Sequence, residues 1–283
     1  MTRIEEQIRA EIVEAGRRLY ARAYIASNDG NITARLDDRR LVATPKSVSK
    51  GFMTPDMMVI VDYDGHKLAG ERDASTELPM HLEIYRNRPD VNAVVHAHPP
   101  IATGFAVAGI PLTRAVLAEV ITTLGSIPIV EYGTPSTSEL PDAVRKYIRA
   151  HDGLLLANHG AVTCGSDVMA AYYKMETIEH FARISLVARL LGREHLISRE
   201  EVERLQGLRG MYGSPAPAPL CADPAEAGGD PVACQVLEAP ASPDGRLVPD
   251  RSFVQTSGGG EIRLTYGELS ALIADAVNTL KES

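Results

Sequence analysis

The chain has 283 residues, of which 45% are hydrophobic, and carries a formal net charge of −8 at pH 7. This length suits one large domain with or without an appendage, and this apolar fraction suits a full-sized core. The negative charge, the absence of a basic run and an aromatic content of 5% argue against a nucleic-acid partner.

The sequence also lacks the marks of a membrane or secreted protein. No apolar stretch reaches the roughly 18 residues of a membrane span, and the charged start MTRIEEQIRAEIVEAGRRLY lacks the apolar segment of a signal peptide. Three widely spaced cysteines form neither a disulfide framework nor a paired metal site. We therefore expect a cytoplasmic protein with no membrane partner.

Hydrophobic periodicity predicts helices and strands along the first 213 residues. A helix opens the chain, with Ile4, Ile8, Ile12, Ala15 and Leu19 on its apolar face. The other predicted elements, in chain order, are strands at 32–36, 41–44 and 59–62, a helix at 75–90, a strand at 91–95, a strand at 128–132, a helix at 138–150, a strand at 153–157, and helices at 167–191 and from Ser198 to about Leu208.

The composition changes after residue 213. Residues 214–260 are rich in Pro, Gly and Ala and predict a mobile linker. Residues 261–283 predict a short amphipathic helix that begins at the capping box TYGE and carries one apolar stripe. The chain therefore divides into a domain at 1–213, a linker at 214–260 and a terminal helix at 261–283.

Two histidines end an apolar run in VVHAHPP, residues 94–100. Side chains two apart share one face of a strand, so His96 and His98 converge, and the prolines that follow end the ladder. His159 follows a second apolar strand in LLLANHG. An isolated H-x-H is more often an ordinary hydrogen-bonded pair, but three imidazoles at neighbouring strand ends are the ligand set of a catalytic zinc.

A carboxylate upstream completes this pattern. Glu77, in DASTELPMH, stands at the start of a predicted helix, where the helix dipole favours a negative charge even without chemistry. Beside a dication it would also serve as a ligand and a base. His81, one turn later, is equally compatible with a structural role. The four other histidines are expected at the surface or in packing: His66, His151, His180 and His195.

Several stretches together resemble the class II aldolase and adducin family, and most closely its L-fuculose-1-phosphate aldolases. These are GNITARL, TPKSVSKGF, STE, NAVVHAHPP and LLLANHGAVTCG, in that order, within residues 1–213. The resemblance implies a three-layer α/β/α class II aldolase fold around a largely antiparallel central sheet. It also implies a homotetramer whose active sites lie between subunits.

The resemblance further implies Zn²⁺ held by His96, His98 and His159, with Glu77 as a fourth ligand that leaves the metal to act as acid and base. The implied reaction is reversible cleavage of a phosphorylated ketose, such as fuculose 1-phosphate or a deoxypentulose 1-phosphate. It yields dihydroxyacetone phosphate and an aldehyde through a metal-stabilised enediolate.

The implied phosphate site matches the pattern of the family only in part. The glycine–asparagine turn and the hydroxyl pair before the glutamate agree with the family, whereas the next loop has T-P-K-S in place of T-P-T-G. The lysine supplies a possible charge, and the loss of the glycine puts the backbone donor in question. The residues expected at the phosphate are Gly30, Asn31, Thr44, Lys46, Ser47, Ser75 and Thr76.

The stretch expected to supply the proton donor to the aldehyde differs more from the pattern of the family. The aldolases use a tyrosine shortly before an S-I-P stretch, and here no tyrosine precedes residues 126–128. Glu119 is expected either to replace that acid or to cap a helix turn. Tyr212 aligns with a C-terminal tyrosine that closes over the site in the aldolases, or is a surface side chain at the end of the domain.

Other functions stay open within the family. A methylthioribulose-1-phosphate dehydratase keeps the glutamate; the epimerases carry aspartate in place of Glu77, and the decarboxylases tend to place lysine where Thr76 stands. A metal-free, adducin-like interaction module does not need the histidines. The terminal helix is expected to dock on its own tetramer or on a partner, as encapsulation peptides dock on a bacterial microcompartment shell.

Overall fold

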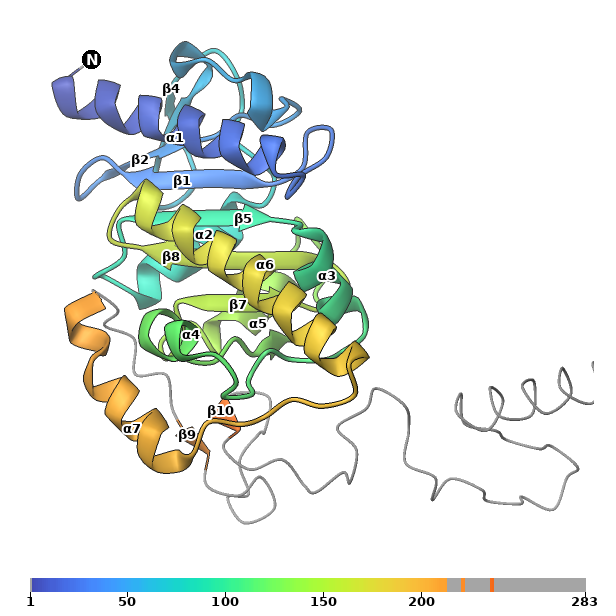
Figure 1. The fold of residues 1–283 in the computed structure, drawn as a ribbon. Coiled ribbons are helices and arrows are strands. Elements are labelled where there is room, and N and C mark those ends of the chain that lie inside the picture. The colour runs from blue at the N-terminus through green and yellow to red at the C-terminus, as the bar shows by residue number, and fades with distance from the viewer. Residues whose placement is uncertain (1, 213–219, 222–234, 237–283) are drawn as a thin grey trace, which may run out of the picture. The chain divides into compact units, whose positions relative to one another are not determined.

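The structure is a computed structural model that describes residues 2–212, 220–221 and 235–236 (Figure 1). Contacts divide the chain into two units: residues 1–184 with 196–238, and residues 185–195 with 239–283. The elements are α1 (Arg3–Ala21), β1 (Asn31–Arg35), β2 (Arg40–Ala43), the 3-10 helices η1 (Lys50–Phe52) and η2 (Pro55–Met57), β3 (Val59–Asp62), β4 (Lys67–Ala69), α2 (Leu78–Asn87), β5 (Ala93–Ala97), α3 (Pro100–Val107), α4 (Ala118–Thr123), β6 (Ile129–Val130), α5 (Glu139–Arg145), β7 (Gly153–Leu156), β8 (Gly160–Gly165), α6 (Val168–Leu190), α7 (Arg199–Gly207), the 3-10 helix η3 (Arg209–Tyr212), β9 (Leu220–Cys221) and β10 (Gln235–Val236).

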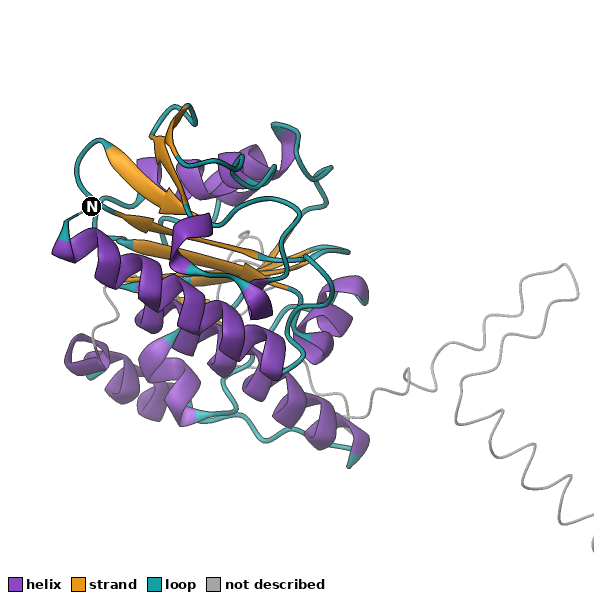
Figure 2. Cartoon of the chain, turned by 90° about the horizontal axis from the view of Figure 1, so that it is seen from above, coloured by secondary structure: helices purple, strands orange, loops and turns teal. Residues whose placement is uncertain are grey.

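The first unit is built on one eight-stranded sheet. Its strand order is β4-β3-β2-β1-β5-β8-β7-β6, and every neighbouring pair is antiparallel except β6 with β7. Helices cover both faces, as the view along the sheet shows (Figure 2). Helices α1 and α6 lie over one face, and α2 and α5 pack on the other (Figure 1). The predicted three-layer α/β/α fold with a largely antiparallel sheet is therefore confirmed.

The opening helix forms as predicted but buries less of its stripe. Thr2 caps it by accepting a hydrogen bond from the Glu5 N–H at 3.2 Å. Ile12 and Leu19 are completely buried, whereas Ile4 is 64% exposed because the buried face of α1 begins only at Arg9. The apolar period thus fixed the type of element, and the extent of the sheet beneath it set how much of the helix is buried.

Helix α2 is the element that delivers the carboxylate. It begins at Leu78, directly after Glu77, with Pro79 in its first turn, where proline needs no backbone donor. Met80, Leu82, Ile84 and Tyr85 are buried, as predicted, in a core that also contains residues of β2, β3 and α5. The tight packing of α2 holds its first residue at a defined position over the sheet.

Several predicted boundaries were wrong, among them those of the helix expected at 75–90, which runs from Leu78 to Asn87. The helix expected at 138–150 is α-helical only to Arg145, because residues 146–150 tighten into i→i+3 turns. The strand expected at 128–132 is confined to Ile129–Val130. Strand β5 runs to Ala97 rather than to residue 95, because β1 and β8 pair with it on both sides as far as His96 and Ala97.

The rest of the chain adds little to the site. In the second unit, α6 ends at Leu190 and Arg189 pairs with Glu194 at 3.1 Å. None of the described helices combines the length and the apolar character needed to cross a bilayer. The predicted linker and terminal helix lie outside the described residues, apart from the two-residue strands β9 and β10, which pair in parallel.

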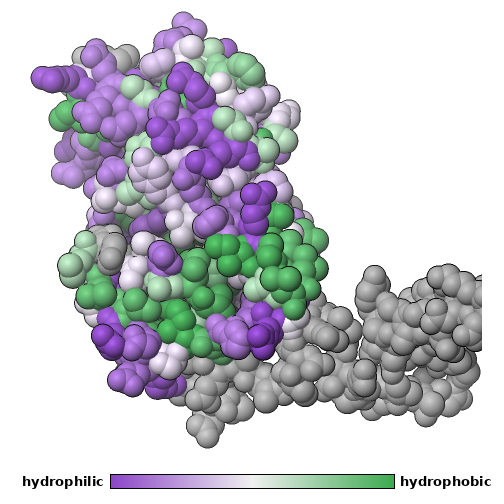
Figure 3. Space-filling model, viewed as in Figure 1, coloured by the Kyte–Doolittle hydropathy of each residue, from purple (hydrophilic) through white to green (hydrophobic). Residues whose placement is uncertain are grey.

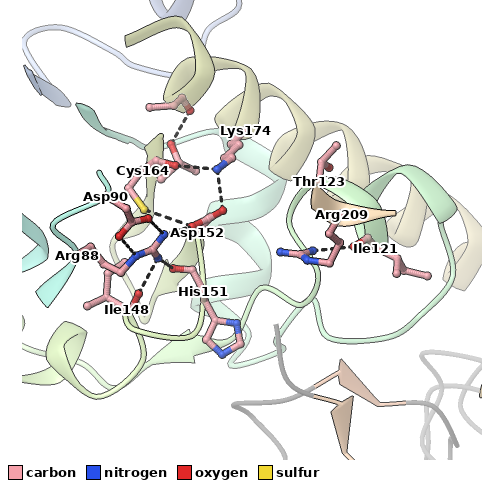
Figure 4. A network of polar contacts seen from close by, with 12 residues as sticks. Arg88, Asp90, Ile121, Thr123, Ile148, His151, Asp152, Cys164, Lys174 and Arg209 are labelled. Atoms are coloured by element: carbon pink, nitrogen blue, oxygen red, sulfur yellow. Dashed lines mark hydrogen bonds and ion pairs between the residues drawn. The ribbon is translucent and has the colours of Figure 1, made fainter. Parts of the chain in front are cut away.

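A buried ionic network ties the layers together (Figure 4). The carboxylate of Asp152, next to β7, is 1% exposed and accepts from Arg88 at 2.8 Å and from Lys174 of α6 at 2.8 Å. Arg88, just after α2, also binds Asp90 at 2.7 Å and donates to the backbone carbonyl of Ile148. Two cations on one buried carboxylate thus connect the helical layers on both faces through the edge of the sheet.

We predict that Asp152→Ala lowers the free energy of unfolding by about 3–5 kcal/mol, because it leaves Lys174 without its carboxylate partner and Arg88 with only Asp90. Urea denaturation of purified protein measures this. A matched control is Asp142→Ala, which breaks the solvent-exposed Arg145–Asp142 pair and should change that free energy by less than about 1 kcal/mol. Equal losses of unfolding free energy in the two variants would contradict a large contribution of the buried network to stability.

Candidate metal centre

Three histidines converge from two neighbouring strands. His96 lies in β5, His98 follows it by two residues, and His159 lies in the loop that joins β7 to β8. That loop turns through Asn158 at φ +54°, a left-handed conformation that asparagine adopts more readily than most residues. A β-carbon on Gly160 would lie 2.6 Å from His98 Cδ2, so only glycine lets the loop approach this closely.

The ring nitrogens face one another at close range. One nitrogen from each of the three rings lies within 4.8 Å of the others. His96 Nε2 and His98 Nε2 are 3.0 Å apart. The Glu77 carboxylate closes the fourth side, with Oε1 at 3.0 Å from His159 Nε2 and Oε2 at 3.4 Å from His96 Nε2. The structure therefore gathers all four residues that the sequence proposed as metal ligands.

Polar contacts on the outer side of the rings determine which ring nitrogen faces the centre of the cluster. His96 Nδ1 lies 2.9 Å from the carbonyl oxygen of Ala161, which accepts only from N–H, so His96 Nε2 carries the free lone pair. Burial lowers the pKa of His96 to about 3, so the ring is neutral at pH 7. His98 Nδ1 lies 3.6 Å from Asp29 Oδ2, which likewise orients its Nε2 toward the cluster.

Glu77 is held as a carboxylate. Asn31, opposite His96 on strand β1, donates from Nδ2 to Glu77 Oε2 at 2.7 Å. Burial by itself raises the pKa of Glu77, but His96, His159 and Asn31 outweigh it, and the pKa lies well below its usual range. One carboxylate and three imidazole rings face a common point, where a cation would be surrounded by oxygen and nitrogen ligands. This donor set fits a divalent metal such as zinc.

A second group of possible ligands, Asp62, Asp64 and His66, lies in the exposed turn between β3 and β4. Asp62 Oδ1 accepts from the backbone N–H groups of Asp64 and His66 at 2.9 and 2.8 Å. These bonds are those of an ordinary polar turn, so this group carries no functional assignment.

The cluster opens into a cavity of about 290 Å³. Six of the seven residues expected at the phosphate line it; the exception is Thr44, which is buried and accepts from the Ile32 N–H at 3.0 Å. Thr44 therefore joins two strands and does not face the cavity. The lining residues are Asn28, Asp29, Gly30, Asn31, Lys46, Ser47, Lys50, Ser75, Thr76, Glu77, His98 and His159.

The loop that lacks the family's glycine keeps a glycine-like backbone. Ser47 has φ +58°, in the left-handed region that costs a side-chain-bearing residue energy. The turn geometry thus survives the replacement of glycine by serine. Lys46, beside it, is half exposed and pairs with Asp73 at 3.1 Å.

Glu119, the residue expected to protonate the aldehyde, does not line the cavity of the cluster within this chain. Glu119 is exposed in the first turn of α4 and lines a different cavity, of about 760 Å³, together with Tyr24 and His180. Tyr212 ends η3, and its side chain lies outside the described structure. His81 is buried and bonds Thr33 Oγ1 at 2.8 Å, which assigns it to packing.

The sequence analysis missed three lining residues: Asn28, Asp29 and Lys50. The first two directly precede Gly30 and Asn31 in the polar turn ASNDGNIT, a composition suited to binding backbone or ligand. Lys50 gave no signal, because a lysine in a loop is almost always exposed.

Comparison with known proteins identifies the family of the chain. The model of the class II aldolase and adducin N-terminal domain matches residues 10–186, so the chain belongs to the class II aldolase and adducin family. An L-fuculose phosphate aldolase of Methanococcus maripaludis is 34% identical over 177 residues, which cover 62% of this chain and 95% of the relative.

Two further relatives differ in their named activity. A 5-deoxy-D-ribulose 1-phosphate aldolase of Bacillus thuringiensis is 33% identical over 208 residues, covering 72% of this chain and 96% of its own. A 3-oxo-tetronate 4-phosphate decarboxylase of Pectobacterium atrosepticum is 32% identical over 187 residues, which cover 65% of this chain and 85% of the relative.

A solved L-fuculose 1-phosphate aldolase superposes with a TM-score of 0.67 at 28% identity, covering 71% of this chain and 95% of that one.

We predict that His159→Ala removes most of the bound metal, because it deletes one of three imidazole donors while leaving the core intact. Metal analysis after dialysis against zinc should find well below one ion per chain, with an unchanged circular dichroism spectrum. His66→Ala, in the exposed turn, is the control and should keep full metal. Full metal retention in His159→Ala would show that His159 is not a ligand of the metal.

We also predict that Ser47→Gly raises the free energy of unfolding by about 1 kcal/mol, because glycine adopts φ +58° without steric cost. Ser47→Val, with a β-branched side chain at the same angle, should lower it. Urea denaturation of both variants beside wild type measures the two shifts. A destabilised glycine variant would mean that the Ser47 side chain itself supports the turn.

Proposed function

We propose that this protein is a zinc-dependent aldolase that reversibly cleaves a phosphorylated ketose to dihydroxyacetone phosphate and an aldehyde. The substrate class is that of fuculose 1-phosphate or a deoxypentulose 1-phosphate. The observation that carries the proposal is the Glu77 carboxylate held among the three imidazoles of His96, His98 and His159, at one end of a cavity lined by polar donors.

Glu77 is proposed as the base that removes a proton from the carbon next to the ketone. Its Oε2 is held by Asn31, and its Oε1 lies beside His159, so the carboxylate is aimed at a single point of the cavity. A divalent cation held by the imidazoles would act as a Lewis acid toward the ketone oxygen. Glu77 then returns the proton when the reaction runs in reverse.

The hydroxyl pair and the turns are proposed to receive the phosphate. Ser75 Oγ accepts from the Glu77 N–H at 3.3 Å, so its own proton is free to donate to an oxygen in the cavity. Thr76 and the Ser47 turn line the same cavity. A phosphate monoester carries only acceptors for such donors, which supports a phosphorylated substrate.

The homotetramer remains part of the proposal. The face over α3, α4 and α6 presents broad apolar surface (Figure 3). Val107 of α3 and Tyr173 of α6 are large side chains that are at least half exposed. Apolar surface of this kind is typical of a subunit interface. Glu119 is proposed to act only across such an interface, because it lines a different cavity from the metal cluster of its own chain. Tyr212 is proposed to close over the site.

The main alternative is another reaction on a sugar phosphate: decarboxylation, as in one relative's name, or dehydration of methylthioribulose 1-phosphate. All of these begin with a metal-polarised carbonyl and a base, so the cluster alone does not separate them. Thr76 before Glu77 favours the aldolase over the decarboxylase, because a lysine expected in the decarboxylases is absent at that position.

The deciding experiment incubates metal-loaded enzyme with dihydroxyacetone phosphate and a panel of aldehydes and detects condensation by mass spectrometry. We expect a ketose phosphate from at least one aldehyde. Parallel reactions with 3-oxo-tetronate 4-phosphate and methylthioribulose 1-phosphate detect carbon dioxide and loss of water. Turnover in either of these, without condensation, would replace the aldolase assignment.

We predict that Glu77→Gln loses about 10²–10⁴-fold in the turnover that this assay identifies, the range usual for a general base. It should keep its zinc, because three imidazoles remain. Glu71→Gln, at an exposed position outside the cavity, is the control. Near-normal turnover in Glu77→Gln would remove this residue from the mechanism.

A further inference from the structure

The cavity beside the metal cluster contains a buried ammonium group. Lys50, the first residue of η1, is 2% exposed and lines the cavity together with Ser75, Thr76 and Glu77. Lysine is seldom buried unless its charge is paired. Among the described residues, Lys50 forms no ion pair within 4.0 Å, so its charge lacks a direct partner.

The backbone of Lys50 is packed against the first helix. A β-carbon on Gly16 of α1 would lie 2.7 Å from the carbonyl oxygen of Lys50, so helix and loop are in direct contact there. The Cβ of Lys50 would lie 3.1 Å from the same position, and the residue also lines the cavity. Its position follows from close packing, and an exposed loop lysine would lack this support.

Two of the three N–H donors of Lys50 are used within the protein. Nζ donates to the carbonyl oxygens of Asn28 at 2.7 Å and of Val48 at 2.9 Å, one from each loop that borders the cavity. The ammonium group therefore links the two loops and has a third N–H that neither carbonyl accepts. Burial lowers the pKa of Lys50 to about 8, against the opposing charges of Asp29 and Glu77.

Lys46, the other ammonium group at this cavity, is placed differently. It is 50% exposed, and its Nζ is paired with Asp73 at 3.1 Å. A salt bridge at the surface is screened by water and contributes little. The charge available to an anion inside the cavity is therefore that of Lys50.

We propose that Lys50 is the cation that binds the phosphate of the substrate, donating its third N–H to a phosphate oxygen while its other two hold the cavity loops together. The inference rests on the proposed phosphorylated substrate. A phosphate dianion supplies both the charge and the acceptor that the buried ammonium lacks, beside the hydroxyl donors of Ser75 and Thr76. Lys46 is a secondary contact at the rim.

The test is isothermal titration of zinc-loaded full-length protein with dihydroxyacetone phosphate and with dihydroxyacetone. Lys50→Met should weaken binding of the phosphorylated ketone by roughly 10- to 100-fold, the loss expected for a charge-assisted hydrogen bond. It should change binding of dihydroxyacetone by less than about threefold, because that ketone has no oxyanion to contact the ammonium. Lys50→Arg, which keeps the charge, should keep most of the preference for phosphate.

Lys46→Gln is the matched comparison, since it removes the other ammonium from the same cavity, and it should weaken binding of the phosphorylated ketone less than Lys50→Met does. A Lys50→Met variant that keeps the wild-type preference for phosphate would overturn the inference. So would equal weakening toward both ketones, which indicates a purely structural clamp. A wild type that prefers the phosphorylated ketone through Lys50 yet forms no carbon–carbon bond supports the inference and overturns only the aldolase.

A second measurement uses the wild type alone, in case Lys50→Met fails to fold. Dihydroxyacetone phosphate, unlike dihydroxyacetone, should slow acetylation of Lys50 by acetic anhydride, quantified by mass spectrometry. Lys67, on β4 and paired with Asp73, serves as the internal reference. Absence of this protection would overturn the inference independently of any variant.

Discussion

The pairing of β5 with β8 is the constraint on which the site depends. It sets His96 against Val162 and Ala97 against Ala161, so the loop before β8 has to pass over the end of β5. That passage brings His159 to His96 of β5 and to His98 just after it, so the three rings face one another at close range. The carboxylate of Glu77 completes the donors for a cation.

The remaining elements hold this arrangement from several sides. Strand β1 pairs with β5 so that Asn31 lies opposite His96, where it binds Glu77. Helix α2 delivers Glu77 from above the sheet, and the Arg88–Asp152–Lys174 network ties the far end of that helix to β7 and α6. A carboxylate held this way loses little freedom when a ligand binds, which is the physical advantage of preorganisation.

Two loop residues give the cavity unusual features. Ser47 adopts a left-handed backbone conformation that glycine would adopt at lower energetic cost. Lys50 places a buried positive charge at the cavity, whereas the charge of Lys46 on the same loop lies at the exposed rim. Both features cost stability where they stand, since one strains the backbone and the other desolvates an ammonium. Residues that work against folding are commonly those that serve a ligand.

The sequence by itself determined the type and order of most elements, because apolar periods of helices and strands are local and strong, as in α1, α2 and β7. It also determined the candidate ligands, since the strand period places His96 and His98 on one face and the strand-end motif repeats at His159. Only the tertiary structure decided how far β5 extends, because pairing on both sides carries it through His96. It likewise decided that Thr44 turns inward, that Glu119 lies at another cavity and that Lys50 is buried. Burial and facing depend on contacts between segments distant in the chain, and no local pattern of residues records them.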